Sequence, residues 1–199
     1  MNEEELEARF NEDEHLPIQV DEGELILLPK TDNKTLHSIS EITITPESIK
    51  TGWVKIDQCY KHLDSINLTE IVYQYQFIKN FHVTAAENIQ TAKINKNHIE
   101  LENITQHSLL CIEADVKILN KNSDNTYSIK NGPYHRRFLD GYFPFRVTLI
   151  IHYPESLLKI KRTSPSNAVG LSLNKERNKI IYDNVFAGQL IINTVFQTQ

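Results

Sequence analysis

The segment Asn131–Arg146 combines charged and aromatic residues more densely than any other part of the chain. It reads NGPYHRRFLDGYFPFR, and residues 134–162 hold six Lys and Arg residues against Asp140 and Glu155, a local charge of +4. Paired arginines can hold a carboxylate, sulfate or phosphate through parallel hydrogen bonds, and aromatic rings can stack on a sugar or contact a protein. The segment therefore predicts a site for a small anion, a sugar or a protein partner. The predicted ligand-binding residues are Tyr134, His135, Arg136, Arg137, Asp140, Tyr142 and Arg146.

A purely structural interpretation of the same segment stays open beside this one. Asn131-Gly132-Pro133 and Asp140-Gly141 are turn signals. Arg136 or Arg137 could pair with Asp140 and stiffen a long connection between strands. In that case the arginines are structural and bind no ligand.

The two cysteines, Cys59 and Cys111, are the second set of residues that could take part in chemistry. In an alternating strand each would lie on the side that carries Lys and Asp or Glu, so both are placed on polar faces. This placement favours a disulfide between neighbouring strands, with Cα atoms roughly 4.4 to 6.8 Å apart, over a bridge through the core. Such a bond predicts maturation in an oxidising compartment, periplasmic or extracellular, and a cytoplasmic location remains the alternative.

Other catalytic or metal-binding patterns are weak. Cys59 and His62 have a spacing that zinc sites use, but Cys111 is the only other cysteine, so no metal site is predicted. The eight histidines include no HExxH pattern, and the chain has neither a GxSxG motif nor a glycine-rich phosphate loop. No cofactor is predicted, and a non-enzyme is favoured.

Apolar and polar residues alternate with a period of two along much of the chain. This pattern predicts the β-strands that carry the residues described above. It predicts strands at 71–77, 110–118 and 145–153, and turn residues predict hairpins around 95–97 and 120–125. Further strands are predicted at 24–28, 38–44, 53–60, 157–161, 169–173, 179–182 and 186–196, and the only helical candidate is residues 2–10. About a dozen short strands favour an all-β fold, a two-sheet and largely antiparallel sandwich, with a closed β-barrel as the alternative. The predicted core residues are Tyr73, Phe77, Ile112, Val116, Val147, Leu149 and Ile151.

The charge of the chain is distributed unevenly. The net charge is −5, yet residues 1–30 contain ten acidic residues against Arg9 and Lys30, which leaves the rest at +3. We therefore expect an acidic N-terminal extension at residues 1–15 and a single domain at residues 16–199. The nearly neutral domain lacks the dense Lys and Arg residues typical of a nucleic-acid-binding protein. The chain contains no run of eighteen apolar residues, so no membrane span is predicted.

These features together favour a binding or assembly module over an enzyme. Frequent isoleucine and asparagine, with more Lys than Arg, indicate an AT-rich and bacterial coding sequence. The expected function is a non-catalytic binding or assembly module of the bacterial cell envelope. The alternative is a hydrolase that acts on an anionic or carbohydrate substrate, with His135, Arg136, Arg137 and Asp140 near its site.

Overall fold

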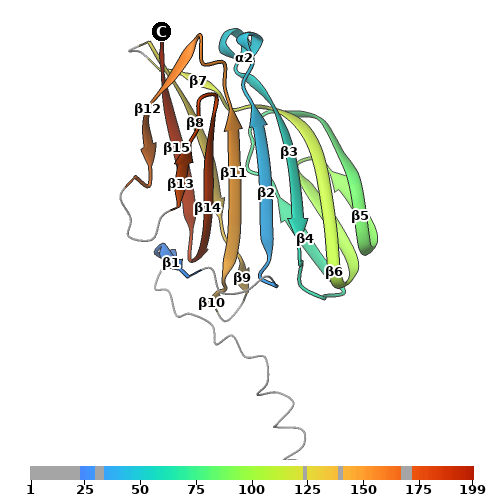
Figure 1. Ribbon diagram of the computed structural model, residues 1–199. Helices are drawn as coiled ribbons and strands as arrows, with labels where there is room; N and C mark the ends of the chain where they lie inside the picture. Colours follow the sequence, from blue (N-terminus) through green and yellow to red (C-terminus); the bar gives the residue numbers. More distant parts are fainter. Residues whose placement is uncertain (1–22, 30–33, 123–124, 139–140, 167–171) are drawn as a thin grey trace, which may run out of the picture.

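Two stacked β-sheets form the protein in the computed structural model, which describes residues 23–29, 34–122, 125–138, 141–166 and 172–199. The larger sheet follows the order β1-β14-β11-β2-β3-β6-β4, with β13 also paired to β14 and β5 to β6 (Figure 1). Its strands are β1 (Ile26–Leu28), β2 (His37–Thr43), β3 (Trp53–Lys61), β4 (Leu68–Val72), β5 (Ile78–Asn95), β6 (His98–Lys117), β11 (Phe145–His152), β13 (Leu173–Lys175) and β14 (Lys179–Ala187). All its pairings are antiparallel except that of β2 with β11.

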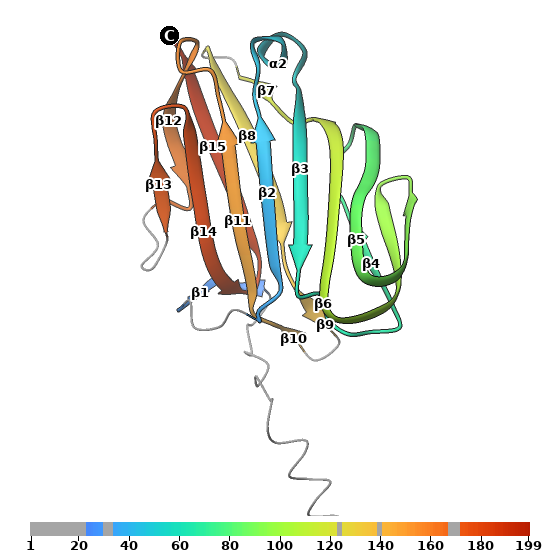
Figure 2. The same cartoon turned by 45° about the vertical axis from the view of Figure 1, so that its right-hand side comes forward.

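The smaller sheet lies behind one half of the larger sheet. It has the order β12-β15-β8-β7, and its strands are β12 (Leu158–Ser164), β15 (Leu190–Thr198), β8 (Thr126–Tyr134) and β7 (Asn120–Lys121). Figures 1 and 2 show that β6, β5 and β4 extend beyond these four strands. The predicted two-sheet sandwich is confirmed over the closed barrel, because the described strands form open sheets. A short hairpin of β9 (Arg137–Phe138) and β10 (Gly141–Tyr142) stands apart from both sheets.

The core lies between the sheets and follows the predicted alternation. Along β11 every second residue is buried, and Val147, Leu149 and Ile151 have no exposed surface. Ile112 and Val116 of β6 and Tyr73 are buried in the same core, as predicted. Phe77 is the exception, because half of its side chain is exposed. The predicted strand 71–77 ends at Val72, so the alternation that would have turned Phe77 inward is lost.

The chain crosses between the sheets at a tight turn after β14. The prediction of one strand over 186–196 is wrong, because β14 ends at Ala187 and β15 begins at Leu190. Gly188 has a φ of 85°, and a Cβ atom there would lie 1.8 Å from the carbonyl oxygen of Glu24. Only glycine therefore fits this turn.

The hairpin predicted around residues 95–97 joins the two longest strands, β5 and β6. Asn95 pairs with His98, so Lys96 and Asn97 form a two-residue loop, and Lys96 has the positive φ that such loops require. The second predicted hairpin is shifted, because Asn120 and Lys121, predicted as turn residues, form β7 and pair with β8, while residues 116–117 belong to β6 of the larger sheet. Between β2 and β3, a helix that the sequence pattern did not predict, α2 (Pro46–Thr51), begins with a capping box at Thr45.

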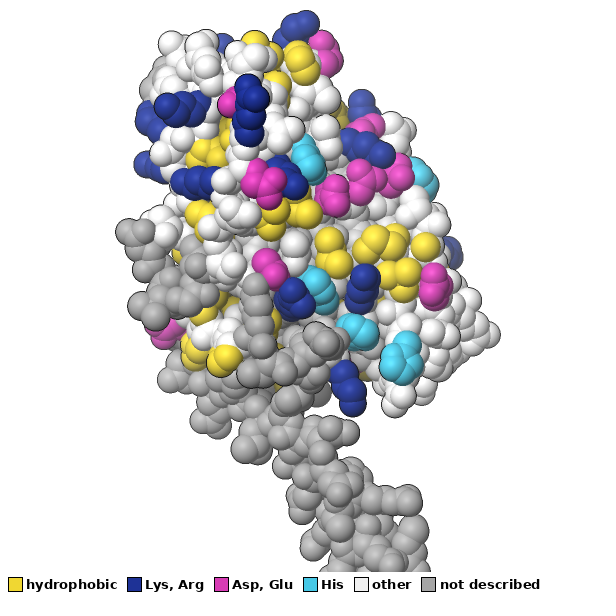
Figure 3. All heavy atoms as spheres, viewed as in Figure 1, with side chains coloured by type: hydrophobic (Ala, Val, Ile, Leu, Met, Phe, Trp, Pro, Cys, Tyr) yellow, Lys and Arg dark blue, Asp and Glu magenta, His cyan; other side chains and the backbone are white. Residues whose placement is uncertain are grey.

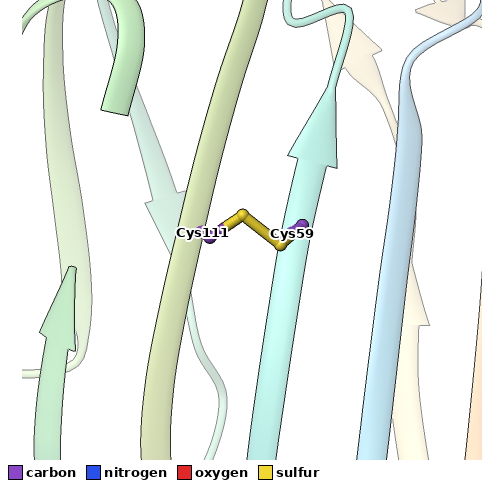
Figure 4. Close-up of a disulfide and its surroundings, with 2 residues drawn as sticks. All are labelled: Cys59 and Cys111. Carbon is purple, nitrogen blue, oxygen red and sulfur yellow. A yellow bond between two sulfur atoms is a disulfide. The ribbon is translucent and has the colours of Figure 1, made fainter. Parts of the chain in front are cut away.

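A disulfide joins the larger sheet across β3 and β6 (Figure 4). Cys59 and Cys111 are directly opposite each other in the antiparallel register, and their Cα atoms are 4.1 Å apart, just below the predicted range. Both side chains are partly exposed on the outer, polar face of the sheet. The predicted placement on neighbouring strands is therefore confirmed.

Three other predictions fall on residues that are not described. The acidic extension at residues 1–15, the helical candidate at 2–10 and part of the predicted strand 169–173 lie outside the described residues. Within the described part of the chain, no helix combines the length and apolar character needed to cross a membrane.

Candidate ligand-binding cavity

A cavity of about 740 Å³ lies beside β3, at the end of the core where the chain segments 63–76 and 130–138 meet the inner face of the larger sheet. We call it the intersheet cavity. Its walls come from Gln58 and Tyr60 of β3, from the connection that runs through β4 to Gln76, from the end of β8, and from the residues after β8. A volume of this size falls within the range of sites for small molecules.

Polar and aromatic side chains form the deep wall of the intersheet cavity. The alternation of β3 turns Val54, Ile56, Gln58 and Tyr60 toward the interior, so its inward face changes from apolar to polar along the strand. The amide of Gln58 donates a hydrogen bond of 2.8 Å to the hydroxyl of Ser38 on β2. Three further tyrosines, Tyr73, Tyr75 and Tyr134, line the same cavity.

Several buried polar atoms around these tyrosines interact with tyrosine hydroxyls but fall outside ordinary hydrogen-bond geometry among the described residues. They are the hydroxyls of Tyr73 and Ser40 and both side-chain amide atoms of Asn131. These three residues are 6%, 3% and 1% exposed. More than nine in ten buried polar groups in folded proteins are paired, so this concentration is unusual.

Burial shifts the pKa of every tyrosine in this group upward. It raises the pKa of Tyr60 to about 12, and it also raises the pKa values of Tyr73, Tyr75 and Tyr134. Interaction with the side-chain amide of Asn131 opposes this rise in the pKa values of Tyr75 and Tyr134. All four phenols are therefore protonated at neutral pH and are available as neutral donors and acceptors.

Charged side chains gather at the rim of the intersheet cavity. The guanidinium of Arg136 makes two hydrogen bonds to the carboxylate of Asp64, one of them 3.0 Å from Nε to Oδ2, and a third to the carbonyl of Pro144. Arg137 and Lys130 are exposed and line the rim. With Glu70 also at the rim, the three cations and two carboxylates leave a charge of +1.

The structure brings together four of the seven residues that the sequence singled out as a ligand site. Tyr134, His135, Arg136 and Arg137 line the intersheet cavity. Arg136 pairs with Asp64, as the structural interpretation would allow, while the expected partner Asp140 is outside the described residues. Arg137 lies over the ring of Tyr142, at 5.5 Å from its centroid.

The remaining three predicted residues are not in the cavity wall. Tyr142 is buried and accepts a hydrogen bond from Gln189, and its ring packs edge-on against that of His135. Arg146 lies on the outer face of the larger sheet, where its guanidinium pairs with Asp183 at 3.0 Å. Asp140 lies outside the described residues.

The deep polar residues of the cavity were missed by the sequence prediction. Gln58 and Tyr60 lie at positions of β3 whose side chains point inward, as Ser40 does on β2. A polar residue at an inward position of a strand is the signal that could have identified them. Asn131 was interpreted only as part of a turn.

The outer face of the larger sheet carries a separate polar network. Thr148 donates a hydrogen bond to Asp183 and therefore accepts one from Nε2 of His37, at 2.8 Å. Partial burial, followed by the charge of Arg146, lowers the pKa of His37 to about 4. A catalytic triad would need the hydroxyl to donate to the histidine, so this network does not activate Thr148 as a nucleophile.

Acidic side chains also gather on this outer face, next to an apolar patch (Figure 3). The register places Glu41, Asp57 and Glu113 side by side across β2, β3 and β6. The ammonium of Lys55 lies 3.2 Å from Asp57 and 3.1 Å from Glu113, so it reduces their mutual repulsion.

Three potential metal ligands meet where β4 pairs with β6. Ligand atoms of Glu70, His98 and Glu100 all lie within 4.8 Å of one another. Glu100 already accepts hydrogen bonds from Asn95 and His98, which lower its pKa. His98 and Glu100 are hydrogen-bonded to each other, and a cluster of exposed and half-buried groups by itself does not establish a metal site.

Fold and site together define an all-β sandwich with a polar, tyrosine-lined cavity. Comparisons with protein-family models, with curated proteins and with solved structures find no match to this chain.

Proposed function

We propose that this protein is a non-catalytic binding module that holds a small ligand in the intersheet cavity. The observation that carries the proposal is a cavity large enough for a small molecule whose wall contains the polar side chains of Gln58, Tyr60 and Tyr134. Leaving a buried polar group unpaired costs about 1–3 kcal/mol. A ligand that completes the hydrogen bonds of these groups would recover part of this cost on binding.

The chemistry of the deep wall supports binding over catalysis. Among the described residues, the buried part of the wall contains no carboxylate, histidine, lysine or free cysteine. Its tyrosines have raised pKa values and are poor bases at neutral pH. The alternative, a hydrolase that uses His135 and the paired arginines, is weakened because Arg136 is bonded to Asp64.

The disulfide supports a location in an oxidising compartment, and we include the bacterial cell envelope in the proposal. Cys59 and Cys111 are directly opposite each other on neighbouring strands, so the bond can form without rearrangement of the sheet. Intact-mass measurement of protein purified without reductant tests this part. Protein exported to the periplasm should be lighter by two hydrogen atoms than the same protein after reduction, and an unchanged mass would contradict the assignment.

The binding function can be tested by filling the cavity. Thr69 lines the cavity and Thr43 lies on the outer face of the larger sheet, so Thr69→Trp fills the site and Thr43→Trp is a matched control. A panel of sugars, alcohols, amines and carboxylic acids is screened for an increase in melting temperature. We expect active compounds to stabilise the wild type and Thr43→Trp but not Thr69→Trp.

Two results would overturn the proposed function. One is a panel in which no compound raises the melting temperature of the wild type. The other is equal stabilisation of the cavity-filled variant, because binding would then take place elsewhere on the protein.

A further inference from the structure

We infer that the ligand of the intersheet cavity is an uncharged carbohydrate, an inference that rests on the proposed binding function and specifies its ligand class. The inference follows from the kinds of polar group in the wall, from where the charges lie, and from the aromatic rings beside them.

The polar groups around the cavity can nearly all both donate and accept hydrogen bonds. Tyrosine and serine hydroxyls have one donor and two acceptor lone pairs, and the amides of Asn131 and Gln58 have both donor and acceptor atoms. A carboxylate ligand would use only the donors, and an ammonium ligand only the acceptors. Hydroxyl groups on the ligand match this mixed set, because each can donate to one wall atom and accept from another.

The distribution of charge argues against an ionic ligand deep in the cavity. The charged side chains of the wall, Asp64, Glu70, Lys130, Arg136 and Arg137, are all exposed or half-buried at the rim. The deep wall of Gln58, Tyr60 and Tyr73 is uncharged. An ion bound there would lose its hydration without gaining a countercharge, which costs several kcal/mol.

Aromatic rings complete the match to a sugar. The rings of Tyr73 and Tyr75 lie 6.0 Å apart at an angle of 31°, and Tyr134 packs edge-on against Phe145 at 6.5 Å. Amphipathic rings of this kind present an apolar face together with a polar hydroxyl. The apolar C–H face of a pyranose can pack on such rings while its hydroxyls reach Tyr60 and Tyr134 in the wall.

The rim is suited to the part of the ligand that remains in water. Arg137, Lys130 and His135 are exposed there and offer donors to a second sugar ring. The volume of about 740 Å³, part of which lies at the rim, favours a disaccharide or the end of a longer glycan over a single sugar.

The test is calorimetry and ligand-observed NMR with named probes. The neutral sugars are maltose, cellobiose and N,N′-diacetylchitobiose, and the competing classes are glucuronate as an anion, choline as a cation and 8-anilinonaphthalene-1-sulfonate as an apolar probe. Each is measured with the wild type, with Tyr60→Phe and Tyr134→Phe in the cavity wall, and with the matched control Tyr182→Phe. Tyr182 is buried outside the cavity, and its hydroxyl is bonded to Thr194.

We expect at least one neutral sugar to bind, with affinity reduced about tenfold or more in Tyr60→Phe and Tyr134→Phe and unchanged in Tyr182→Phe, since tenfold corresponds to about 1.4 kcal/mol. If only glucuronate, choline or the apolar probe binds, and the two cavity variants weaken it, the carbohydrate assignment is wrong while the binding function stands. If no probe binds, or if binding is equal in all variants, both the assignment and the proposed function fail.

Discussion

Replacing Tyr73 with phenylalanine tests one structural observation about the cavity wall without any ligand. The hydroxyl of Tyr73 is buried and interacts with Tyr60, but it makes no hydrogen bond of ordinary geometry among the described residues, so folding removes it from water with little compensation. Such a loss costs about 1–3 kcal/mol, whereas the ring keeps its packing against Phe81 at 5.1 Å. We therefore expect Tyr73→Phe to leave the free energy of unfolding unchanged or to raise it by about 1 kcal/mol.

The matched variant is Tyr182→Phe, which makes the same chemical change in the packed core. The hydroxyl of Tyr182 is 3.2 Å from that of Thr194, and both residues are fully buried. Loss of this hydrogen bond should lower the free energy of unfolding by about 1 kcal/mol or more, because the hydroxyl of Thr194 loses a partner. The two variants should therefore differ in sign, or by at least about 1 kcal/mol.

Urea unfolding followed by circular dichroism and tyrosine fluorescence measures both variants. The midpoint should shift to equal or higher urea for Tyr73→Phe and to lower urea for Tyr182→Phe, with unchanged slopes. A loss of stability in Tyr73→Phe as large as that in Tyr182→Phe would refute the reasoning. It would mean that the Tyr73 hydroxyl is satisfied in the ligand-free protein.

Three further predictions concern the core, the disulfide and the polar network. Leu149→Ala should lower the free energy of unfolding by about 2–5 kcal/mol, because the side chain is fully buried, and a urea titration showing a loss below about 0.5 kcal/mol would contradict its position. Replacing both cysteines with serine should cost about 4 kcal/mol by the loop-closure model for a separation of 52 residues, and an unchanged urea midpoint without reductant would show that the bond contributes nothing. Because the pKa of His37 is about 4 when folded and about 6.5 when unfolded, the unfolded state binds more protons between these values. Stability should therefore fall as the pH decreases from about 6.5 to about 4, and His37→Asn should flatten that part of the profile; a parallel profile for wild type and variant would show that another group is responsible.

Local pattern was sufficient to predict the strands that span the core. Alternation in 145–153 correctly placed Val147, Leu149 and Ile151 inside, because a strand with one buried face must repeat every second residue. The same parity placed Cys59 and Cys111 on outer faces, which led to the disulfide between neighbouring strands. These predictions succeeded because each depends only on which side of a strand a residue occupies.

Predictions failed where a contact distant in the sequence decides the conformation. The turn at Gly188 is forced by the close approach of Glu24, more than 160 residues earlier in the chain, so alternation in 186–196 seemed unbroken. Phe77 is exposed because β4 ends at Val72, and the residues that follow form one side of the cavity instead of a strand.

The sequence by itself determined the all-β class, the core face of the central strands and the position of the disulfide, because alternation and side-chain parity are properties of single strands. The tertiary structure decided where the cavity lies, because its wall combines β3, the segment 63–76 and the end of β8, which are far apart in the sequence. It also decided which charges are available, since Arg136 finds Asp64 across 72 positions of the chain. Inward-facing residues such as Gln58 and Ser40 look alike in the sequence whether they are packed or face a cavity, and only the arrangement of the opposite wall distinguishes the two.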